Sequence, residues 1–363
     1  MTLHDWVQWL SAKNEKSFRA KSLFKWLYVE NQWNPLVMSD FPKNIREKLL
    51  EEFDFFTPQI DTLLSSSDGS DKILLKLSDN RLTECVLMPS ENRVTLCVSS
   101  QVGCKMACTF CQTGKMGLMR NLTSGEILYQ ITLGNQRLRD RQIDRKITNI
   151  VFMGMGEPLD NFDHVVESCS VMIDPFYFGL SKHKVTVSTS GLIPEIEKLG
   201  AKVPVALAIS LHNAFDEERS KIMPINKKYP LDELKQALLR YPIQTRHGIT
   251  FEYVMLENVN DSMRHAKKLV QFLHGLKAKV NLIPMNPHPG SNLTSSHESQ
   301  MKEFQKYLSD RSIPAPIRYS RGQDVSAACG QLALKRKDEL ELTPRSVAIL
   351  RQRELRSSFA ADH

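Results

Sequence analysis

The sequence predicts an α/β fold built on a parallel β-sheet. Short runs rich in β-branched and other apolar residues recur through the middle of the chain, and longer stretches with helical potential separate them. Strands that alternate with helices in this way are typical of βαβ units. Six runs are fewer than the eight strands of a complete (β/α)₈ barrel, so an open barrel and a doubly wound sheet are the two candidates. The runs span 94–100, 147–155, 184–191, 205–212, 249–256 and 279–286.

Other elements are expected on both sides of these six runs. Apolar residues recur at helical spacing through residues 1–60, so this segment is predicted to be helical. Residues 71–88 alternate between apolar and polar side chains and turn at residues 78–80, which predicts a β-hairpin. A last strand-like run covers 315–322, and the mixed-charge tail after Leu332 is predicted to be helical.

The composition places the chain among ordinary globular proteins. Hydrophobic residues make up 41% and charged residues 25% of the 363 residues, which excludes a collagen, a disordered chain and a disulfide scaffold. No apolar stretch approaches about 18 residues, and no basic segment precedes an apolar run at the N-terminus. We therefore expect a cytoplasmic protein with no membrane partner.

The charge pattern is compatible with a polyanionic partner but does not identify one. The formal net charge is +7. Arg19, Lys21 and Lys25 interleave with the apolar positions of the N-terminal segment. This pattern is typical of a solvated helix face, and the alternative is a surface that contacts nucleic-acid phosphates.

Three cysteines form the strongest motif. Cys104, Cys108 and Cys111 have the spacing C-x3-C-x2-C and follow the first of the six runs. In a reducing compartment such a group indicates metal binding or catalysis rather than disulfides. Three thiolates on an iron–sulfur cubane leave one iron open to a small molecule. A structural zinc site needs a fourth ligand, for which Cys97 or a histidine is the candidate. The spacing and the position after a strand favour the iron–sulfur cluster.

This arrangement resembles the radical S-adenosylmethionine (SAM) superfamily. The resemblance implies a partial (β/α)₆ barrel in which Cys104, Cys108 and Cys111 hold a [4Fe–4S] cluster. It further implies that SAM binds the fourth iron through its amino and carboxylate groups. One electron from the cluster would then cleave SAM to a 5′-deoxyadenosyl radical.

Further motifs, in order along the chain, resemble the RlmN/Cfr family of RNA methyltransferases over roughly residues 18–332. The proline in GEPL, where the Cfr branch has alanine after the glutamate, favours the RlmN branch. The motifs are FRAKSLFKWLY (18–28), FMGMGEPLDN (152–161), VTVSTSG (185–191), AISLHNAFDEER (208–219), PINKKYPL (224–231), FEYVMLENVNDS (251–262), IPMNPHPG (283–290) and AACGQL (327–332).

The resemblance implies four regions. They are a helical RNA-binding domain over 1–60, a β-hairpin extension over 61–92 and the partial barrel over 93–320. The fourth, 321–363, is a C-terminal loop with a reactive cysteine and a helical tail.

The resemblance also assigns a SAM site to the ends of the predicted strands. Taken alone, Gly156 and Glu157 form a strand-to-loop turn, where glycine allows close backbone approach and a carboxylate can accept from an amino group. Isolated Ser, His or Asn residues at strand ends are ordinarily loop or cap residues. By resemblance, the residues that bind SAM are Gly156, Glu157, Ser188, Ser210, Leu211, His212 and Asn286.

Three residues receive catalytic roles by resemblance. Cys329 lies in a small-residue stretch that leaves its thiol accessible, and it is the implied methyl carrier. Cys97 taken alone is a buried apolar residue, and it is the implied resolving thiol. Glu84 taken alone is an exposed strand carboxylate, and it is the implied proton acceptor. Cys85 and Cys169 match no motif and are expected in the core. Because a thiolate must attack SAM, we expect the surroundings to lower the pKa of Cys329.

The implied activity is methylation of C2 of an adenosine in 23S rRNA and in tRNA, through a methylated cysteine and a covalent enzyme–RNA intermediate. Each turnover would use two SAM molecules, and a cellular electron donor such as flavodoxin would reduce the cluster. A monomer is expected. Cfr-like methylation at C8 is the nearest alternative, because it shares every cysteine role. A non-catalytic RNA-binding protein with zinc or an iron–sulfur centre is the alternative from another class.

Overall fold

The computed structural model describes residues 3–243, 248–288 and 291–332. The helix expected in the C-terminal tail lies outside these residues. The N-terminal segment is helical, as predicted, and its buried side chains include Leu10, Leu23 and Ile45. Its elements are α1 (Leu3–Ala12), α2 (Arg19–Phe24), the π-helical turn η1 (Lys25–Val29), the short 3₁₀ turn η2 (Pro35–Val37) and α3 (Lys43–Glu52).

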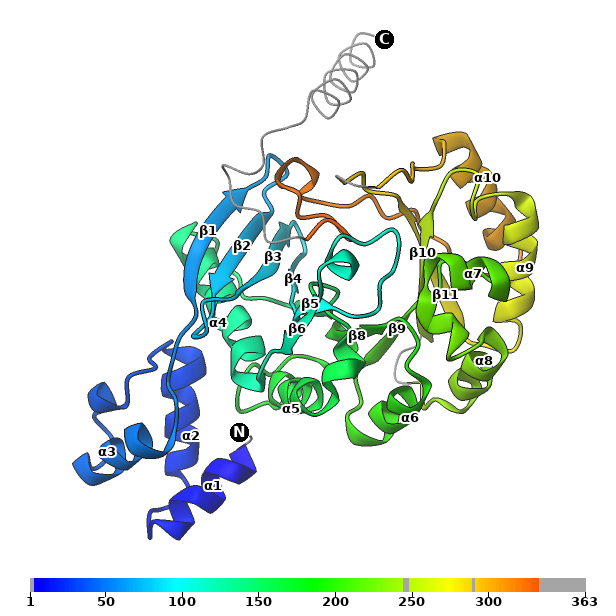
Figure 1. Ribbon diagram of the computed structural model, residues 1–363. Helices are drawn as coiled ribbons and strands as arrows, with labels where there is room; N and C mark the ends of the chain where they lie inside the picture. Colours follow the sequence, from blue (N-terminus) through cyan, green and yellow to red (C-terminus); the bar gives the residue numbers. More distant parts are fainter. Residues whose placement is uncertain (1–2, 244–247, 289–290, 333–363) are drawn as a thin grey trace. The chain divides into compact units, whose positions relative to one another are not determined.

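A nine-stranded sheet forms the centre of the fold (Figure 1). Its order is β1-β2-β3-β4-β7-β8-β9-β10-β11. The first four strands pair antiparallel, and every pairing from β4 to β11 is parallel. The strands are β1 (Gln59–Ser65), β2 (Asp71–Lys76), β3 (Leu82–Ser90), β4 (Arg93–Cys97), β7 (Asn149–Phe152), β8 (Val185–Thr189), β9 (Ala206–Ser210), β10 (Ile249–Met255) and β11 (Ala278–Pro284).

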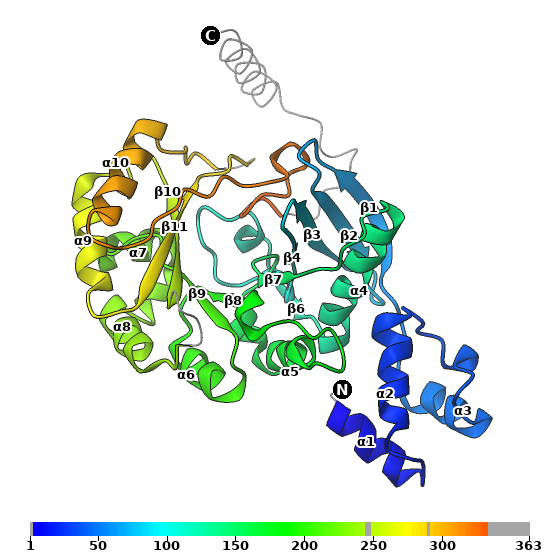
Figure 2. The same ribbon diagram turned by 180° about the vertical axis from the view of Figure 1, so that it is seen from behind.

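The strand order selects the open barrel over the doubly wound sheet. Each of the six predicted runs is a strand, and each adds to the same edge of the sheet as the one before it. A doubly wound sheet would instead reverse direction at a switch point. Helices therefore cover the outer side of the curved sheet (Figures 1 and 2). They are α4 (Ser124–Asp140), α5 (Phe162–Ile173), α6 (Ile193–Lys202), α7 (Asp216–Ile222), α8 (Leu231–Arg240), α9 (Met263–Leu273) and α10 (Glu298–Ser309).

Alternation along the strands divides the sheet into an apolar outer face and a more polar inner face. Leu87, Leu96 and Ile150 are register partners across β3, β4 and β7, and all are buried. Leu96 packs against Gly134 of α4, so this row faces the helices. Neighbouring residues in a strand point to opposite faces. Cys97 therefore points toward the interior of the open barrel.

The structure confirms the predicted hairpin and corrects one predicted strand. β2 and β3 pair antiparallel over 71–87. The run 315–322 forms only a parallel bridge between Ile317 and Leu282 among the described residues. Pro314 and Pro316 accept hydrogen bonds from β11 but have no N–H to donate, so a regular ladder cannot form.

Three strands were not predicted. β1 is interrupted by an irregularity between Ile60 and Thr62, which obscures its alternation. β5 (Gln101–Cys104) and β6 (Gly117–Asn121) form a separate two-stranded sheet and are too short to show a periodic pattern.

Of the helices in the described part of the chain, none combines the length and the apolar character that a membrane crossing requires.

Packing of the outer face predicts a large stability loss on truncation of Leu96. Leu96→Ala should lower the free energy of unfolding by about 2–5 kcal/mol, because it removes buried methyl groups and leaves a cavity against α4. Urea unfolding measures the change. Leu50→Ala, at a position 43% exposed on α3, is the control and should shift stability by less than about 0.5 kcal/mol. Equal losses in the two variants would contradict this account of the core.

Candidate active site

The three motif cysteines lie on β5 and the loop that follows it. Cys104 ends β5, while Cys108 and Cys111 lie in the loop before the 3₁₀ turn η3 (Thr113–Lys115). The strand can approach its partner closely because Gly103 has a φ of +79° and no side chain. A Cβ there would lie 1.9 Å from the carbonyl oxygen of Gly117.

The three thiols are close enough to interact electrostatically. Burial, together with the thiols of Cys111 and Cys104, raises the pKa of Cys108 well above its usual value. Burial raises the pKa of Cys104 to about 12. Among the described residues, no three His, Cys, Asp or Glu side chains are arranged to hold a single metal ion. An iron–sulfur cubane needs a different arrangement, because each cysteine binds a different iron atom. Bound metal also keeps the thiols deprotonated. Three neighbouring thiols match that donor set.

Gly156 and Glu157 follow β7, beside the cysteine strand. Gly156 has a φ of +105°, and a Cβ there would lie 2.6 Å from the Cβ of Gln101 on β5. The main-chain N–H of Glu157 donates to Oε1 of Gln101 at 2.8 Å. The buried Glu157 carboxylate accepts from the N–H groups of Leu159 and Ser190. Burial raises the pKa of Glu157. The cysteine strand and the loop after β7 are thus locked together.

Arg219, which was not predicted as a site residue, connects the ends of β8 and β9 by hydrogen bonds. Ser188 lies on β8, and Ser210 is the last residue of β9. The buried guanidinium of Arg219 donates to the carbonyl oxygens of Ser190, Ser210 and Leu211 at 2.8–3.0 Å. Burial lowers the pKa of Arg219 to about 10. Only its place within the 208–219 motif could have marked it.

His212 follows Leu211, and its backbone has a left-handed conformation with a φ of +57°. Its Nδ1 accepts from the N–H of Val254 at 3.0 Å. Burial and the nearby charge of Arg219 lower the pKa of His212 to about 3, so the imidazole is neutral. Its ring meets Phe110 of the cysteine loop edge-on, with ring centroids 4.6 Å apart. The β9 end therefore contacts the cysteine loop.

Asn286 and the cysteine loop both hold the backbone around Cys329. Nδ2 of Asn286 donates to the carbonyl oxygen of Cys329 at 3.0 Å and to Oγ of Ser320 at 2.9 Å. The N–H of Gln112 donates to the carbonyl oxygen of Gly330 at 2.8 Å. This segment crosses the opening of the sheet between β11 and the β1–β3 strands (Figures 1 and 2). The cysteine near the C-terminus therefore lies beside the cysteine loop.

The prediction that the surroundings lower the pKa of Cys329 is wrong. Residue Cys329 as a whole is exposed to solvent, but protein atoms pack around its sulfur. That burial, together with the Glu252 carboxylate and the Cys111 thiol, raises the pKa of Cys329 to about 11. Negative neighbours disfavour a second negative charge.

Cys97 and Glu84 share the inner face of the sheet with the Cys329 segment. Burial raises the pKa of Cys97, and the thiol of Cys329 raises it further. Glu84 is fully buried, which corrects the interpretation as an exposed strand carboxylate. Its Oε1 lies 3.1 Å from Nζ of Lys72 on β2, and this ion pair was not predicted. A lysine within the apolar run of β2 was the available signal.

The remaining two cysteines lie in the core as expected. Cys85 and Cys169 are both fully buried within the hydrophobic core.

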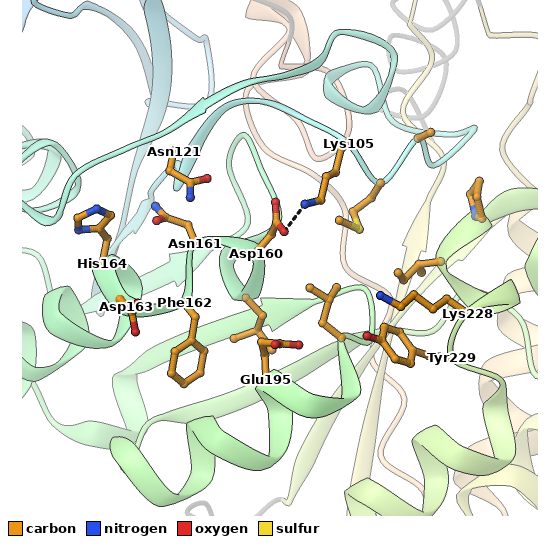
Figure 3. A pocket seen from close by; sticks show the side chains of 16 residues that line it. Lys105, Asn121, Asp160, Asn161, Phe162, Asp163, His164, Glu195, Lys228 and Tyr229 are labelled. Atoms are coloured by element: carbon orange, nitrogen blue, oxygen red, sulfur yellow. Dashed lines mark ion pairs between the residues drawn. The ribbon is translucent and has the colours of Figure 1, made fainter.

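A cavity of about 710 Å³ lies beside the cysteine loop rather than at the site described above (Figure 3). Lys105, between the first two motif cysteines, forms an ion pair with Asp160 at 2.6 Å on its wall. Phe162, Glu195 and Tyr229 also line it. None of the predicted site residues lines this cavity.

Comparison with known proteins identifies the family. Residues 98–270 match the radical SAM superfamily, and residues 1–54 match the ribosomal RNA large subunit methyltransferase N-terminal domain. The chain is 44% identical to the dual-specificity RNA methyltransferase RlmN of Geotalea uraniireducens over 331 residues, which cover 91% of this chain and 94% of the relative. This chain belongs to the RlmN family of radical SAM RNA methyltransferases.

A solved structure confirms the fold of this RlmN-family protein. The crystal structure of a radical SAM methyltransferase from Sphaerobacter thermophilus matches with a TM-score of 0.86 and 39% sequence identity. The match covers 92% of this chain and 98% of that chain. Membership of the RlmN family implies a [4Fe–4S] cluster, SAM and a ribosomal RNA substrate. It also favours an enzyme over a non-catalytic RNA-binding protein.

The position of the three cysteines predicts which thiols the cluster needs. Cys108→Ala should abolish the brown absorbance and the iron content of anaerobically reconstituted protein, because one of three protein ligands is lost. Cys169→Ala is the matched control. This cysteine is buried in α5, away from the loop, and its loss should leave the cluster intact. A Cys108→Ala protein that stays brown and active would remove Cys108 from the ligand set.

Proposed function

We propose that this RlmN-family protein methylates C2 of an adenosine in 23S rRNA and in tRNA. Cys329 carries the methyl group, and a covalent enzyme–RNA intermediate forms. The observation that supports this most strongly is that Cys97 and Glu84 lie on the same inner face of the sheet and that the Cys329 segment is held against that face. The thiol of Cys329 contributes to the raised pKa of Cys97, and Lys72 binds both Glu84 and the carbonyl oxygen of Ser326.

The chemistry explains why a carrier cysteine is needed. C2 of adenine is an electron-poor aromatic carbon without an acidic proton, so it cannot attack the methyl group of SAM as a nucleophile. A sulfur nucleophile can. The Cys329 sulfur takes the methyl group of one SAM, the thiol proton leaves, and S-adenosylhomocysteine departs. This first stage consumes one of the two SAM molecules in each turnover.

The second stage depends on the cluster site. Cys104, Cys108 and Cys111 would hold the [4Fe–4S] cluster, and the predicted SAM residues at the ends of β7, β8, β9 and β11 would hold SAM beside it. When bound there, the cluster and SAM would supply the radical chemistry by which the methyl group on Cys329 loses one hydrogen atom. A cellular electron donor such as flavodoxin provides the electron.

Residues of this chain complete the transfer. The carbon radical on Cys329 adds to C2 and links the enzyme to the RNA. The adduct then gives up one electron, which the oxidised cluster would accept, and Glu84 takes the C2 proton. Cys97 loses its thiol proton and attacks the Cys329 sulfur, so an S–S bond forms as the S–C bond breaks. The released carbon keeps the electron pair of that bond and takes up a proton to become the methyl group, and the methylated RNA leaves. An external dithiol reductant restores both thiols.

The RNA must bring a base into the barrel. C2 lies inside a stacked helix, so the target adenosine is turned out of its stack or taken from a loop. The N-terminal helices, residues 1–60, are the proposed RNA-binding domain, and the enzyme acts as a monomer. Phe18 is 58% exposed there, and Lys21 lies over the exposed ring of Phe176 at 4.0 Å. Cationic and aromatic side chains of this kind suit phosphates and unstacked bases.

The product identifies the reaction. RNA treated with reconstituted enzyme, SAM and a reductant should contain 2-methyladenosine when its nucleosides are measured by mass spectrometry. Separate reactions with an rRNA fragment and a tRNA show which RNA is used. 8-Methyladenosine would place the protein with the C8 enzymes, and unmodified adenosine despite SAM cleavage would mean a different substrate.

Resolution of the intermediate predicts a trapped adduct. Cys97→Ala should accumulate a covalent protein–RNA species on a denaturing gel, because the thiol that releases the RNA is missing. Cys85→Ala, on the neighbouring strand β3, is the matched control and should turn over normally. Cys329→Ala should give neither adduct nor methylated RNA. Normal turnover by Cys97→Ala would remove this thiol from the mechanism.

A further inference from the structure

Lys72 is a buried charge that the reaction described above does not use. It lies on β2 with its side chain essentially inaccessible to solvent. Nζ contacts Oε1 of Glu84 at 3.1 Å and donates to the carbonyl oxygen of Ser326 at 3.3 Å. A buried ammonium is costly unless its partners are well placed. These contacts therefore tie the position of Lys72 to both partners.

The register of the sheet directs Lys72 toward the reacting groups. Lys72 pairs with Val86 on β3, and Val86 pairs with Cys97 on β4. Directly opposed residues share a face, and residues two apart in one strand do so as well. Lys72, Glu84 and Cys97 therefore lie on the same inner face of the sheet.

The second contact of Lys72 reaches the segment that carries the proposed methyl carrier. Ser326 precedes Cys329 by three residues and has a φ of +52°. The same segment is fixed at its start, where the N–H of Gly322 donates to Oδ2 of Asp68 at 2.9 Å. Lys72 thus joins a strand carboxylate to the loop of Cys329 across more than 250 residues of sequence.

An interpretation in terms of stability alone explains this ion pair poorly. Replacing a buried ion pair by packed apolar side chains is often neutral or stabilising. Lys72 lies between Asp71 and Ile73 on β2, and Leu74, the next residue on the same face, is apolar, so an apolar residue would suit that face. What an apolar residue could not do is hold a carboxylate and a main-chain carbonyl in one arrangement.

We propose that Lys72 is a positioning residue for the methyl-transfer reaction, which holds Glu84 and the Cys329 segment against the same adenine. This inference rests on the proposed function, in which Glu84 takes the C2 proton and Cys329 carries the methyl group. Lys72 itself does not touch the base. It acts by fixing the carboxylate through one contact and the loop backbone through the other.

The test separates positioning from RNA binding. Lys72→Met should lower kcat for 2-methyladenosine formation by roughly ten- to hundredfold, because small displacements of reacting groups cost rates of this order. KM for RNA should stay within about threefold, since the Lys72 side chain is buried and offers no surface to RNA. In single-turnover reactions the ratio of covalent adduct to released product should rise, because proton removal is slowed. Lys76→Met, at the exposed end of β2, is the matched control and should behave as wild type.

A double variant keeps the test decisive if Lys72→Met folds poorly. Removing Lys72 alone leaves the Glu84 charge buried, whereas Lys72→Met with Glu84→Gln leaves no charge. Because Lys72 acts in part through Glu84, adding Lys72→Met to Glu84→Gln should lower kcat by a smaller factor than Lys72→Met does on its own. Multiplying losses, or a Lys72→Met enzyme with wild-type kcat and adduct ratio, would overturn the proposal.

Failure of the proposed function gives a different result. In that case the wild-type enzyme forms no 2-methyladenosine and Cys97→Ala traps no adduct, whatever residue occupies position 72. If wild type and Cys97→Ala behave as proposed while Lys72→Met turns over normally, only the role of Lys72 is wrong.

Discussion

Pairing of the polar groups inside the open barrel is the constraint on which the rest of the structure depends. The outer face of the sheet packs on helices, where the buried Asp71 of β2 pairs with Arg137 and Arg141, whereas Lys72 of β2 and Glu84 of β3 point inward. Each then needs a partner away from bulk water. Arg219 meets this need by binding three carbonyl groups at strand ends, and Glu157 accepts two main-chain N–H groups. These bonds fix the loops where substrate chemistry takes place.

The sequence predicted the parts of the fold that local patterns encode. The six parallel strands were evident because each is an apolar, β-branched run between longer segments with helical potential. The burial of Glu84 was not, since its partner Lys72 lies on a neighbouring strand and no periodicity links the two. The placement of Cys97 and the Cys329 segment on the same side of the sheet depends on the whole barrel, so only the family resemblance indicated it. Arg219 was missed because a charged residue in a short helix ordinarily lies in solvent.

The raised pKa of Cys329 changes the account of its nucleophilicity. A permanently low pKa would have made the thiolate available at all times, as in many reactive cysteines. Here Glu252 and Cys111 oppose the thiolate. The sulfonium of SAM carries a positive charge, and a positive charge nearby favours the ionised thiol. Under the proposed function, the thiol is therefore best activated when the methyl donor is beside it, which would limit reaction with other electrophiles.

The proposed function requires Cys329 to meet a methyl donor, a radical, an RNA base and Cys97 in succession, and the contacts of its segment are compatible with that requirement. Lys72 binds the carbonyl oxygen of Ser326, Asn286 binds that of Cys329 itself, and Gln112 binds that of Gly330. All three contacts go to the main chain. The backbone is held from β2, from the end of β11 and from the cysteine loop, while the side chain can change rotamer. Precise placement of the loop and changing chemistry at sulfur are thus compatible, because they use different atoms.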